Sequence, residues 1–373
     1  MSKQRILSIE YIRGLSMLGV IGIHTGAYSL ANPAVNVHLF ALLEICTRFS
    51  VPIFFFVSAF GLFLHHNLEA PFNYINFMKR RCRTVLIPYI VWSLLYMIHY
   101  TWVSGDSSPW LPGILYKYLL FGLASYQLYF LVILLWFYSF MPLWRMIVKY
   151  IAKAPIFYLS LLLLLQIVVN YYSSYILEAN FANRYINMAI QYRLSYWVVH
   201  YIFIFLLGAI CALHYQQFVH KLKKYRIAIT CFFCITLLGM TGYYYYLLFS
   251  KHYSPEEAVN TVHQLSPIGV LYTLATTLFL LLLFESYRLT PSSKATLTQL
   301  GERSYAVYLV HPFVMYYLIS FINSQNIIMS VPVVLLFYIF TAAISLAVSW
   351  LIYFSSRFLP SIGILLTGCT AKK

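Results

Sequence analysis

The chain has 373 residues, of which 62% are hydrophobic and only 9% are charged. Soluble domains of this length carry roughly 25% charged residues, so this composition excludes an ordinary water-soluble fold. The formal net charge of +16 raises the question of nucleic-acid binding, but the placement of the basic residues along the chain argues against it.

Apolar segments of about 20 residues, the length that crosses a hydrocarbon core, recur along the whole chain. We therefore predict one membrane domain over residues 1–373, an all-α bundle of about ten transmembrane helices with a cytoplasmic N-terminus. The predicted spans are residues 7–30, 38–64, 84–103, 123–144, 155–172, 196–213, 227–249, 266–284, 304–322 and 331–355.

The basic residues fall mainly in the segments that this topology places in the cytoplasm. The exceptions are Lys117, Arg184, Arg193 and Lys251 outside, and Arg48 within the second span. This bias is the positive-inside pattern, and it sets the orientation of the chain. The positive charge is therefore a sign of topology, and we expect anionic lipid headgroups of the bilayer as its partner, with no nucleic acid.

The first predicted helix carries three ionisable residues, Glu10, Arg13 and His24. Such residues are costly inside a bilayer and are candidates for function. Eleven steps of about 100° bring His24 to within ~20° of the direction of Arg13, about 16 Å further along the helix. Glu10 and Arg13 form an i,i+3 pair. An interfacial ion pair with a structural histidine is the alternative, but the alignment of Arg13 with His24 favours a functional stripe.

The second predicted helix carries Glu44 and Arg48 as an i,i+4 pair. Glu44 and His24 both lie about 9 Å from the outer ends of their helices. A carboxylate at that depth can orient an imidazole and raise its basicity. Glu44 can equally serve only to neutralise Arg48, and the sequence leaves these two interpretations open.

A basic run at residues 79–83 includes Arg80 and Arg83 and lies at the predicted inner surface. Composition favours contact with lipid headgroups, and a phosphorylated cofactor entering from the cytoplasm is the alternative. Further along, Gln127 and Tyr129 open the fourth predicted helix on the outer side.

The ninth predicted helix contains Tyr305, Tyr308 and His311 in the run Ser304–Pro312. The histidine lies about 12 Å into the bilayer. It is therefore a further ionisable residue within a span, and we include it and the two tyrosines among the candidate site residues.

Four elements together resemble membrane-bound acyltransferase family 3, whose members O-acylate polysaccharides and other acceptors. They are Arg13-x10-His24 with its Glu10–Gly14 start, Val51–Ser58, Arg80-x-x-Arg83 followed by Ile87-Pro88-Tyr89, and Ser304–Pro312. Glu10 stands where the family more often has Asp. Gln127 stands where many members have His, which makes the chain similar to intercellular-adhesin-type exopolysaccharide-modifying proteins.

The resemblance implies transfer of an acyl group, such as acetyl or succinyl, from cytoplasmic acyl-CoA to a hydroxyl of a cell-surface or exported polysaccharide. It implies that Arg13, Arg80 and Arg83 hold the donor's phosphates, since guanidinium groups suit phosphate recognition. His24 would act as general base or accept the acyl group transiently. We expect Glu44 and Glu10 beside it in the catalytic set, and a second, substrate-binding set made of Arg48, Gln127, Tyr129, Tyr305, Tyr308 and His311.

Acyl-CoA, with acetyl-CoA as the expected form, is then a co-substrate, and we expect no permanently bound cofactor and no metal. The expected location is a bacterial plasma membrane, with polysaccharide synthase subunits as further candidate partners. An exopolysaccharide exporter or flippase, or a synthase-associated subunit without catalysis, is the competing hypothesis, because inward-facing ionisable residues serve either purpose.

Overall fold

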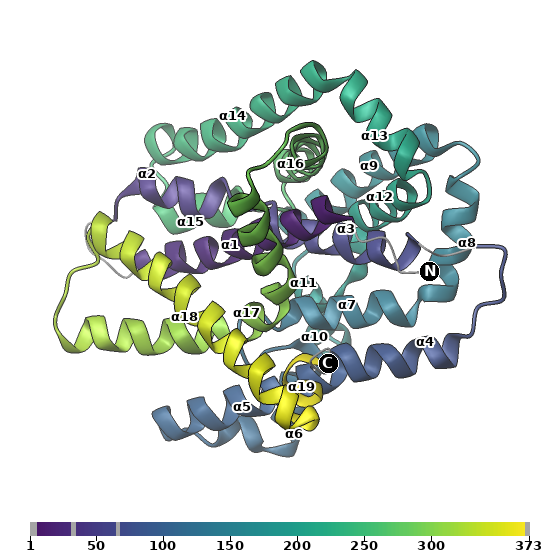
Figure 1. Cartoon of the computed structure of the whole chain (residues 1–373). Helices are drawn as coiled ribbons and strands as arrows, with labels where there is room; N and C mark the ends of the chain where they lie inside the picture. The colour runs from purple at the N-terminus through teal and green to yellow at the C-terminus, as the bar shows by residue number, and fades with distance from the viewer. Residues whose placement is uncertain (1–5, 31–34, 65–67, 370–373) are drawn as a thin grey trace. The chain divides into compact units, whose positions relative to one another are not determined.

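The computed structural model describes residues 6–30, 35–64 and 68–369 (Figure 1). Over these residues the regular elements are all helices, without any strand. The all-α prediction is therefore confirmed. In a bilayer this is one of two available solutions, because helices satisfy their backbone hydrogen bonds within one segment.

Within the described ranges, seven helices are long and apolar enough to cross a membrane. The number rises to nine if each of two bent helix pairs is one span; these pairs are bent by 71° and 103°. The seven are Val37–Phe63, Tyr74–Ser104, Pro155–Ile176, Arg226–Ser250, Pro267–Ser286, Pro291–Ser324 and Val331–Phe358, and the pairs are Tyr129–Ser139 with Met141–Ile151 and Val198–Leu213 with Tyr215–Lys224. The chain is thus a multi-pass membrane protein.

The first predicted span is a helix of 23 residues, α1. It is not one of the seven helices that are apolar enough by composition. Its length of about 35 Å is sufficient to cross the hydrocarbon core. Glu10, Arg13 and His24 lower its apolar content. The predicted cytoplasmic N-terminus falls on residues 1–5, which lie outside the described residues, so the orientation stays a prediction.

The helices fall into two compact units, and the chain passes between them several times. Unit 1 comprises Met1–His66, Ala154–Ser174 and Phe203–Ala347. Its elements are α1 (Leu7–Ser29), α2 (Val37–Phe40), the π-helix η1 (Ala41–Ile45), α3 (Ser50–Phe63), α9 (Pro155–Tyr171), α12 (Ile202–Leu213), α13 (Tyr215–Lys224), α14 (Arg226–Ser250), α15 (Pro255–Thr261), α16 (Pro267–Ser286), α17 (Pro291–Ser324) and most of α18 (Val331–Phe358).

Unit 2 comprises Asn67–Lys153, Tyr175–Ile202 and Val348–Lys373. Its elements are α4 (Tyr74–Arg81), the π-helix η2 (Cys82–Leu86), α5 (Ile87–Ser104), η3 (Ser108–Trp110), α6 (Pro112–Phe121), α7 (Tyr129–Ser139), α8 (Met141–Ile151), α10 (Arg184–Gln191), α11 (Arg193–Tyr196), η5 (Val198–Tyr201) and α19 (Pro360–Thr367), and the π-helix η4 (Tyr172–Ile176) joins the two units.

Several helices begin with the same local sequence, a hydroxyl residue followed by proline. Ser266 accepts a hydrogen bond from the amide of Gly269, and Thr290 accepts one from Ser293, with Pro267 and Pro291 at the first helical position. The hydroxyl satisfies an amide that has no partner within the helix, and proline lacks an amide to satisfy. These signals fix the starts of α16 and α17, the helices that pack beside α1.

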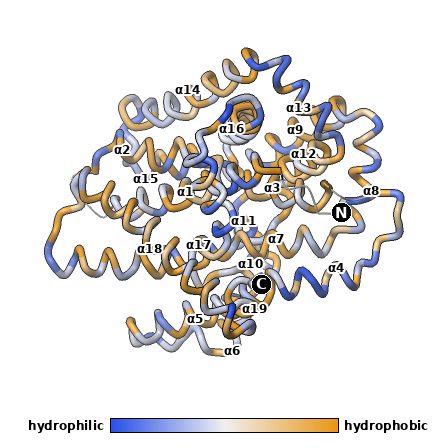
Figure 2. Tube along the Cα trace, viewed as in Figure 1, coloured by the Kyte–Doolittle hydropathy of each residue, from blue (hydrophilic) through white to orange (hydrophobic). Residues whose placement is uncertain are grey.

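Burial differs sharply among the apolar helices. The apolar window of Val37–Phe63 is 67% buried, whereas those of α14 and α18 are 17% and 22% buried. Figure 2 shows hydrophobic residues along both α14 and α18. A helix that is apolar around its whole circumference but exposed in the protein is suited to lipid contact. The second predicted span is therefore an interior element, and α14 and α18 are suited to contact lipid.

The second and fourth predicted spans differ from continuous helices. The second consists of α2, η1, a turn at residues 46–49, and α3. The fourth begins with turns at residues 122–128, and its helix starts only at Tyr129. Irregular backbone at membrane depth is tolerated where it is buried in protein, so both departures are places where polar groups can be held.

Candidate functional site

Glycines on one face of α1 pack against the irregular segment that follows α2. A Cβ atom added to Gly22 would lie 3.3 Å from the Leu43 carbonyl oxygen, and one added to Gly26 would collide with the Glu44 side chain. Small residues allow close helix approach in membranes. The glycines of α1 therefore set the depth at which Glu44 enters unit 1.

A second pair of glycines brings α1 against α17. A Cβ atom on Gly14 would lie 2.9 Å from the Gly301 amide nitrogen, and one on Gly301 would collide with the Glu10 carbonyl oxygen. Further along the same two helices, His24 contacts His311. Because both helices advance from the glycine contact to the histidine contact in the direction of increasing residue number, α1 and α17 run parallel, as the predicted topology requires of the first and ninth spans.

The His24 and His311 rings stack, with centroids 5.4 Å apart and an angle of 21° between their planes. His311 is 0% exposed, and His24 is half-buried. Two imidazoles from different helices thus meet at the junction of α1 and α17. Each imidazole can donate or accept a proton, so the pair is a candidate acid–base centre.

The backbone around His311 is shaped by Pro312, which lies inside α17. Proline has no amide hydrogen, so position 312 cannot make the usual backbone bond to the Tyr308 carbonyl oxygen. The Nδ1 atom of His311 lies 3.3 Å from the Val307 carbonyl oxygen, where the Nδ1–H tautomer donates a hydrogen bond. The Tyr308 ring centroid lies 6.1 Å from that of His311.

Glu44 and Arg48 form the predicted i,i+4 ion pair, with 2.8 Å between Glu44 Oε2 and Arg48 Nη2. Their side chains are only 4% and 15% exposed. Arg48 Nη1 also lies 3.5 Å from Gln264 Oε1, and the Tyr272 hydroxyl donates to the Cys46 carbonyl oxygen at 2.7 Å. These contacts hold the wide π-turn η1 and the turn after it, a local geometry that occurs often at functional sites.

Glu44 reaches α1 at Gly26, and side chains two positions apart on a helix point about 160° away from each other. Its carboxylate therefore packs on the face of α1 opposite to His24. The ion pair is confirmed, and the orienting role of Glu44 toward His24 stays a prediction.

Glu10 and Arg13 form the predicted i,i+3 pair, with 3.2 Å between Oε2 and Nη1. The Arg13 side chain is 34% exposed, and that of Glu10 is 9% exposed. Since α1 is one continuous helix, the alignment of Arg13 with His24 on one face is retained. Tyr305 is half-buried and Tyr308 buried on α17.

The remaining candidate residues belong to unit 2. Arg80 and Arg83 are exposed, at the end of α4 and in η2. Arg83 and Lys79 border a cavity of about 550 Å³ whose other lining residues are Tyr74, Ile75, Met78, Cys82, Ile87 and Ile364. An apolar cavity with a basic rim suits a lipid as well as a phosphorylated donor, so both interpretations of these arginines remain.

Gln127 is 2% exposed and lies in the turn before α7, and Tyr129 is the first residue of that helix. The structure therefore brings together Glu10 with Arg13, Glu44 with Arg48, and His24 with His311 within unit 1. Arg80, Arg83, Gln127 and Tyr129 belong to unit 2.

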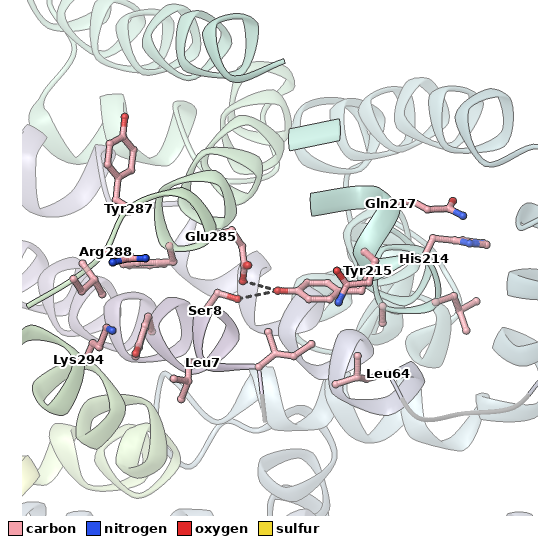
Figure 3. A pocket seen from close by; sticks show the side chains of 17 residues that line it. Leu7, Ser8, Leu64, His214, Tyr215, Gln217, Glu285, Tyr287, Arg288 and Lys294 are labelled. Carbon is pink, nitrogen blue, oxygen red and sulfur yellow. Dashed lines mark hydrogen bonds between the residues drawn. The ribbon is translucent and has the colours of Figure 1, made fainter. Parts of the chain in front are cut away.

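Sequence reasoning missed a cavity of about 690 Å³ in unit 1, at the Leu7 end of α1 (Figure 3). In it, the Tyr215 hydroxyl donates to Glu285 Oε1 and lies 3.5 Å from Ser8 Oγ. The one available signal was Glu285, an acidic residue directly after the eighth predicted span. The other two members of the cluster, Ser8 and Tyr215, come from α1 and α13. These are far from Glu285 in sequence, so no local pattern could have revealed the cluster.

Comparison with known proteins gives one family. The family model described as an acyltransferase domain matches residues 6–354 of the chain. No curated protein and no solved structure gives a match.

Proposed function

The chain belongs to this acyltransferase family, and from that premise we propose that it is an O-acyltransferase that modifies an exported polysaccharide. The donor in this proposal is cytoplasmic acyl-CoA, with acetyl or succinyl as the acyl group. The protein works in the plasma membrane of a bacterial cell. The observation that carries the proposal is the stacking of His24 on His311. His24 also lies on the same face of α1 as Arg13.

In the proposed reaction, His24 takes the proton from an acceptor hydroxyl, and the hydroxyl oxygen attacks the carbonyl carbon of the thioester. The carbon–sulfur bond then breaks, the ester is formed, and the thiolate of CoA takes up the proton from the imidazolium. An alternative route passes the acyl group through His24 first. Both routes need a basic imidazole nitrogen at position 24, and both lose the reaction when that nitrogen is removed.

The polarity of the two ends of α1 supports the proposed direction of transfer. Arg13 lies near the end that the charge distribution assigns to the cytoplasm, and His24 lies about 16 Å beyond it. That separation is comparable to the reach of a pantetheine arm. A donor bound from the cytoplasm would thus present its acyl group near the outer leaflet, where a glycan acceptor is available.

The test is mass spectrometry of cell-surface polysaccharide from cells with and without the gene. We expect a fixed acyl mass on the sugar residues that disappears when the gene is deleted and returns with the wild-type gene but not with His24→Gln. If the gene instead changes the amount of polysaccharide at the surface and leaves its mass unchanged, the protein is an exporter and the proposal is wrong.

A further inference from the structure

The cavity at the Leu7 end of α1 is not used by the chemistry proposed at His24. It lies among the ends of α3, α12 and α16 and the starts of α1, α13 and α17, all within unit 1. Its volume of about 690 Å³ falls within the ~300–1,000 Å³ of pockets that hold small organic ligands. The cavity is therefore large enough for a ligand of the size of a nucleotide.

The charges around the cavity are unbalanced. Arg288 and Lys294 line it, and Figure 3 shows both side chains on the same side of it. Across the described part of the chain, neither residue has an ion-pair partner. Glu285, the acidic residue of the lining, accepts a hydrogen bond from the Tyr215 hydroxyl. Two neighbouring cations without a carboxylate partner favour an anionic ligand, and guanidinium and ammonium groups both suit phosphate.

The lining also offers an aromatic surface. Tyr287 lies next to Arg288 in the chain, and its side chain is 67% exposed. Exposed aromatic rings beside cations are a common arrangement for binding nucleobases, since every base has a face that can stack. Phosphate-binding cations, an aromatic ring and hydroxyl groups together fit a phosphorylated nucleotide better than a simple inorganic anion.

The position of the cavity along the chain assigns it to the cytoplasmic side. Its lining residues end or follow the second, sixth and eighth predicted spans, begin the first, or, as Lys294 does, lie between the eighth and the ninth. The adjoining helix α13 ends in Lys221, Lys223 and Lys224. By the positive-inside rule this end of unit 1 faces the cytoplasm, where soluble nucleotides are available.

We propose that this cavity binds the phosphorylated nucleotide end of the acyl-CoA donor, through Arg288 and Lys294 to its phosphates and Tyr287 to its base. The inference rests on the proposed function. Tyr11 of α1 also lines the cavity, and His24 lies 13 residues further, about 20 Å along the axis and on another side of the helix. The flexible arm of the donor follows α1 obliquely from the cavity toward the imidazole.

This site differs from the phosphate site expected from the sequence motifs. Arg13 is engaged by Glu10 at 3.2 Å, whereas Arg288 and Lys294 have no carboxylate to displace. In the proposed complex Arg13 therefore contacts the arm of the donor, and the phosphates bind at the other face of α1.

The experiment measures binding and does not depend on turnover. The full-length protein is purified in an uncharged detergent, and the affinities of CoA and of CoA lacking its 3′-phosphate are measured by calorimetry. We expect Arg288→Gln with Lys294→Gln to weaken CoA binding by at least about tenfold, because charge-assisted hydrogen bonds are lost, and to reduce the preference for CoA over the dephosphorylated form.

The matched control replaces Arg226 and Lys223, an exposed arginine and lysine of unit 1 that do not line the cavity. Arg226→Gln with Lys223→Gln should leave both affinities unchanged. Elution of each variant as a single species in size-exclusion chromatography reports folding, and the single substitution Arg288→Gln replaces the double variant if the latter aggregates.

Three outcomes overturn the inference. The first is wild-type CoA affinity in the Arg288→Gln/Lys294→Gln variant, which places the phosphates elsewhere and leaves the proposed function intact. The second is that the variant no longer retains phosphatidylglycerol through purification while its CoA affinity is unaffected, which makes the cavity a lipid site. The third is absence of CoA binding by the wild type, which also ends the proposed use of acyl-CoA. The His24→Gln variant should bind CoA normally and fail to transfer the acyl group. An error in the catalytic assignment would therefore show in the transfer assay and not in the binding measurement.

Discussion

His24 of α1 stacks on His311 of α17, with ring centroids 5.4 Å apart. The contact joins two helices that also touch backbone to backbone at Gly14 and Gly301. The histidine pair is therefore positioned by the close packing of α1 and α17 at these glycines, about three helical turns away. Its geometry depends on residues that take no part in the proposed reaction.

His24→Gln should abolish acyl transfer while leaving the protein folded. Glutamine keeps hydrogen-bonding capacity but cannot remove a proton near neutral pH, and loss of a general base typically costs ~10²–10⁴ in rate. The measurement is transfer of radiolabelled acetyl from acetyl-CoA to polysaccharide in membrane vesicles. His38→Gln is the matched control, since His38 is exposed and bonded to Tyr245 at 2.9 Å. Near-normal transfer by His24→Gln would remove His24 from the mechanism.

His311→Ala should lower the rate of transfer by about 10²-fold, because a misplaced catalytic group commonly costs that much. The substitution removes the ring on which His24 stacks. His311→Phe restores an aromatic ring without the nitrogen that faces Val307, and we expect it to recover part of the lost rate. The same vesicle assay measures both variants, and an alanine variant with an unchanged rate would show that the stack is not needed.

Gly301→Ala should destabilise the protein and also lower transfer. The new methyl group would collide with the Glu10 carbonyl oxygen, and overpacking of this kind costs ~1–3 kcal/mol. Gly242→Ala is the matched control, because an added Cβ there has nothing within 4 Å and alanine favours helix by up to ~1 kcal/mol. Thermal unfolding in detergent should show a lower midpoint for Gly301→Ala only; equal midpoints would contradict the close crossing of α1 and α17.

Arg80→Ala with Arg83→Ala discriminates between the two interpretations of the basic run at residues 79–83. If these exposed arginines contact donor phosphates, the apparent affinity for acyl-CoA should fall in steady-state assays while the protein remains inserted. An unchanged KM for acyl-CoA, together with weaker association with anionic lipid, would assign them to headgroups. Lys149→Ala is a suitable control in the same unit, since its partner is Glu69 at 2.8 Å.

Topology is tested with single cysteines at Lys221 and Lys251, which flank the 25-residue helix α14. In a variant lacking the six native cysteines, a membrane-impermeant maleimide added to intact cells should label position 251 and not position 221. The charge distribution predicts this arrangement. Labelling of both positions from the same side would refute the proposed orientation of α14.

The parts of the site that depend on one helix could be predicted from the sequence. The Glu10–Arg13 pair follows from helical spacing, and it is present. The Glu44–Arg48 pair that the same spacing predicted is also present, although Glu44 lies in a π-turn and Arg48 in the turn after it. The alignment of Arg13 with His24 holds because α1 has no break. Repeating apolar segments also predicted the helical fold, α1 included, although the polar stripe of α1 weakens the apolar signal that identifies a span.

Contacts between helices could not be predicted in the same way. Nothing in the local pattern of α1 or α17 indicates that His24 meets His311, because this depends on which glycines touch. Nor does the pattern around Glu44 predict a π-turn, since its cause lies in partners from other segments, Gln264 and Tyr272. The cavity around Tyr215 and Glu285 was missed for the same reason.

The π-turn at Ala41–Ile45 has a consequence for comparing this chain with relatives. A wide turn holds one residue more than the α-helical turn it replaces, so a relative without it reaches the same depth with one residue fewer. An alignment drawn without a gap through this stretch would then pair Arg48 with a neighbour of its true counterpart. Residues after the turn should therefore be matched by their position in space, with an insertion or deletion allowed between residues 41 and 45.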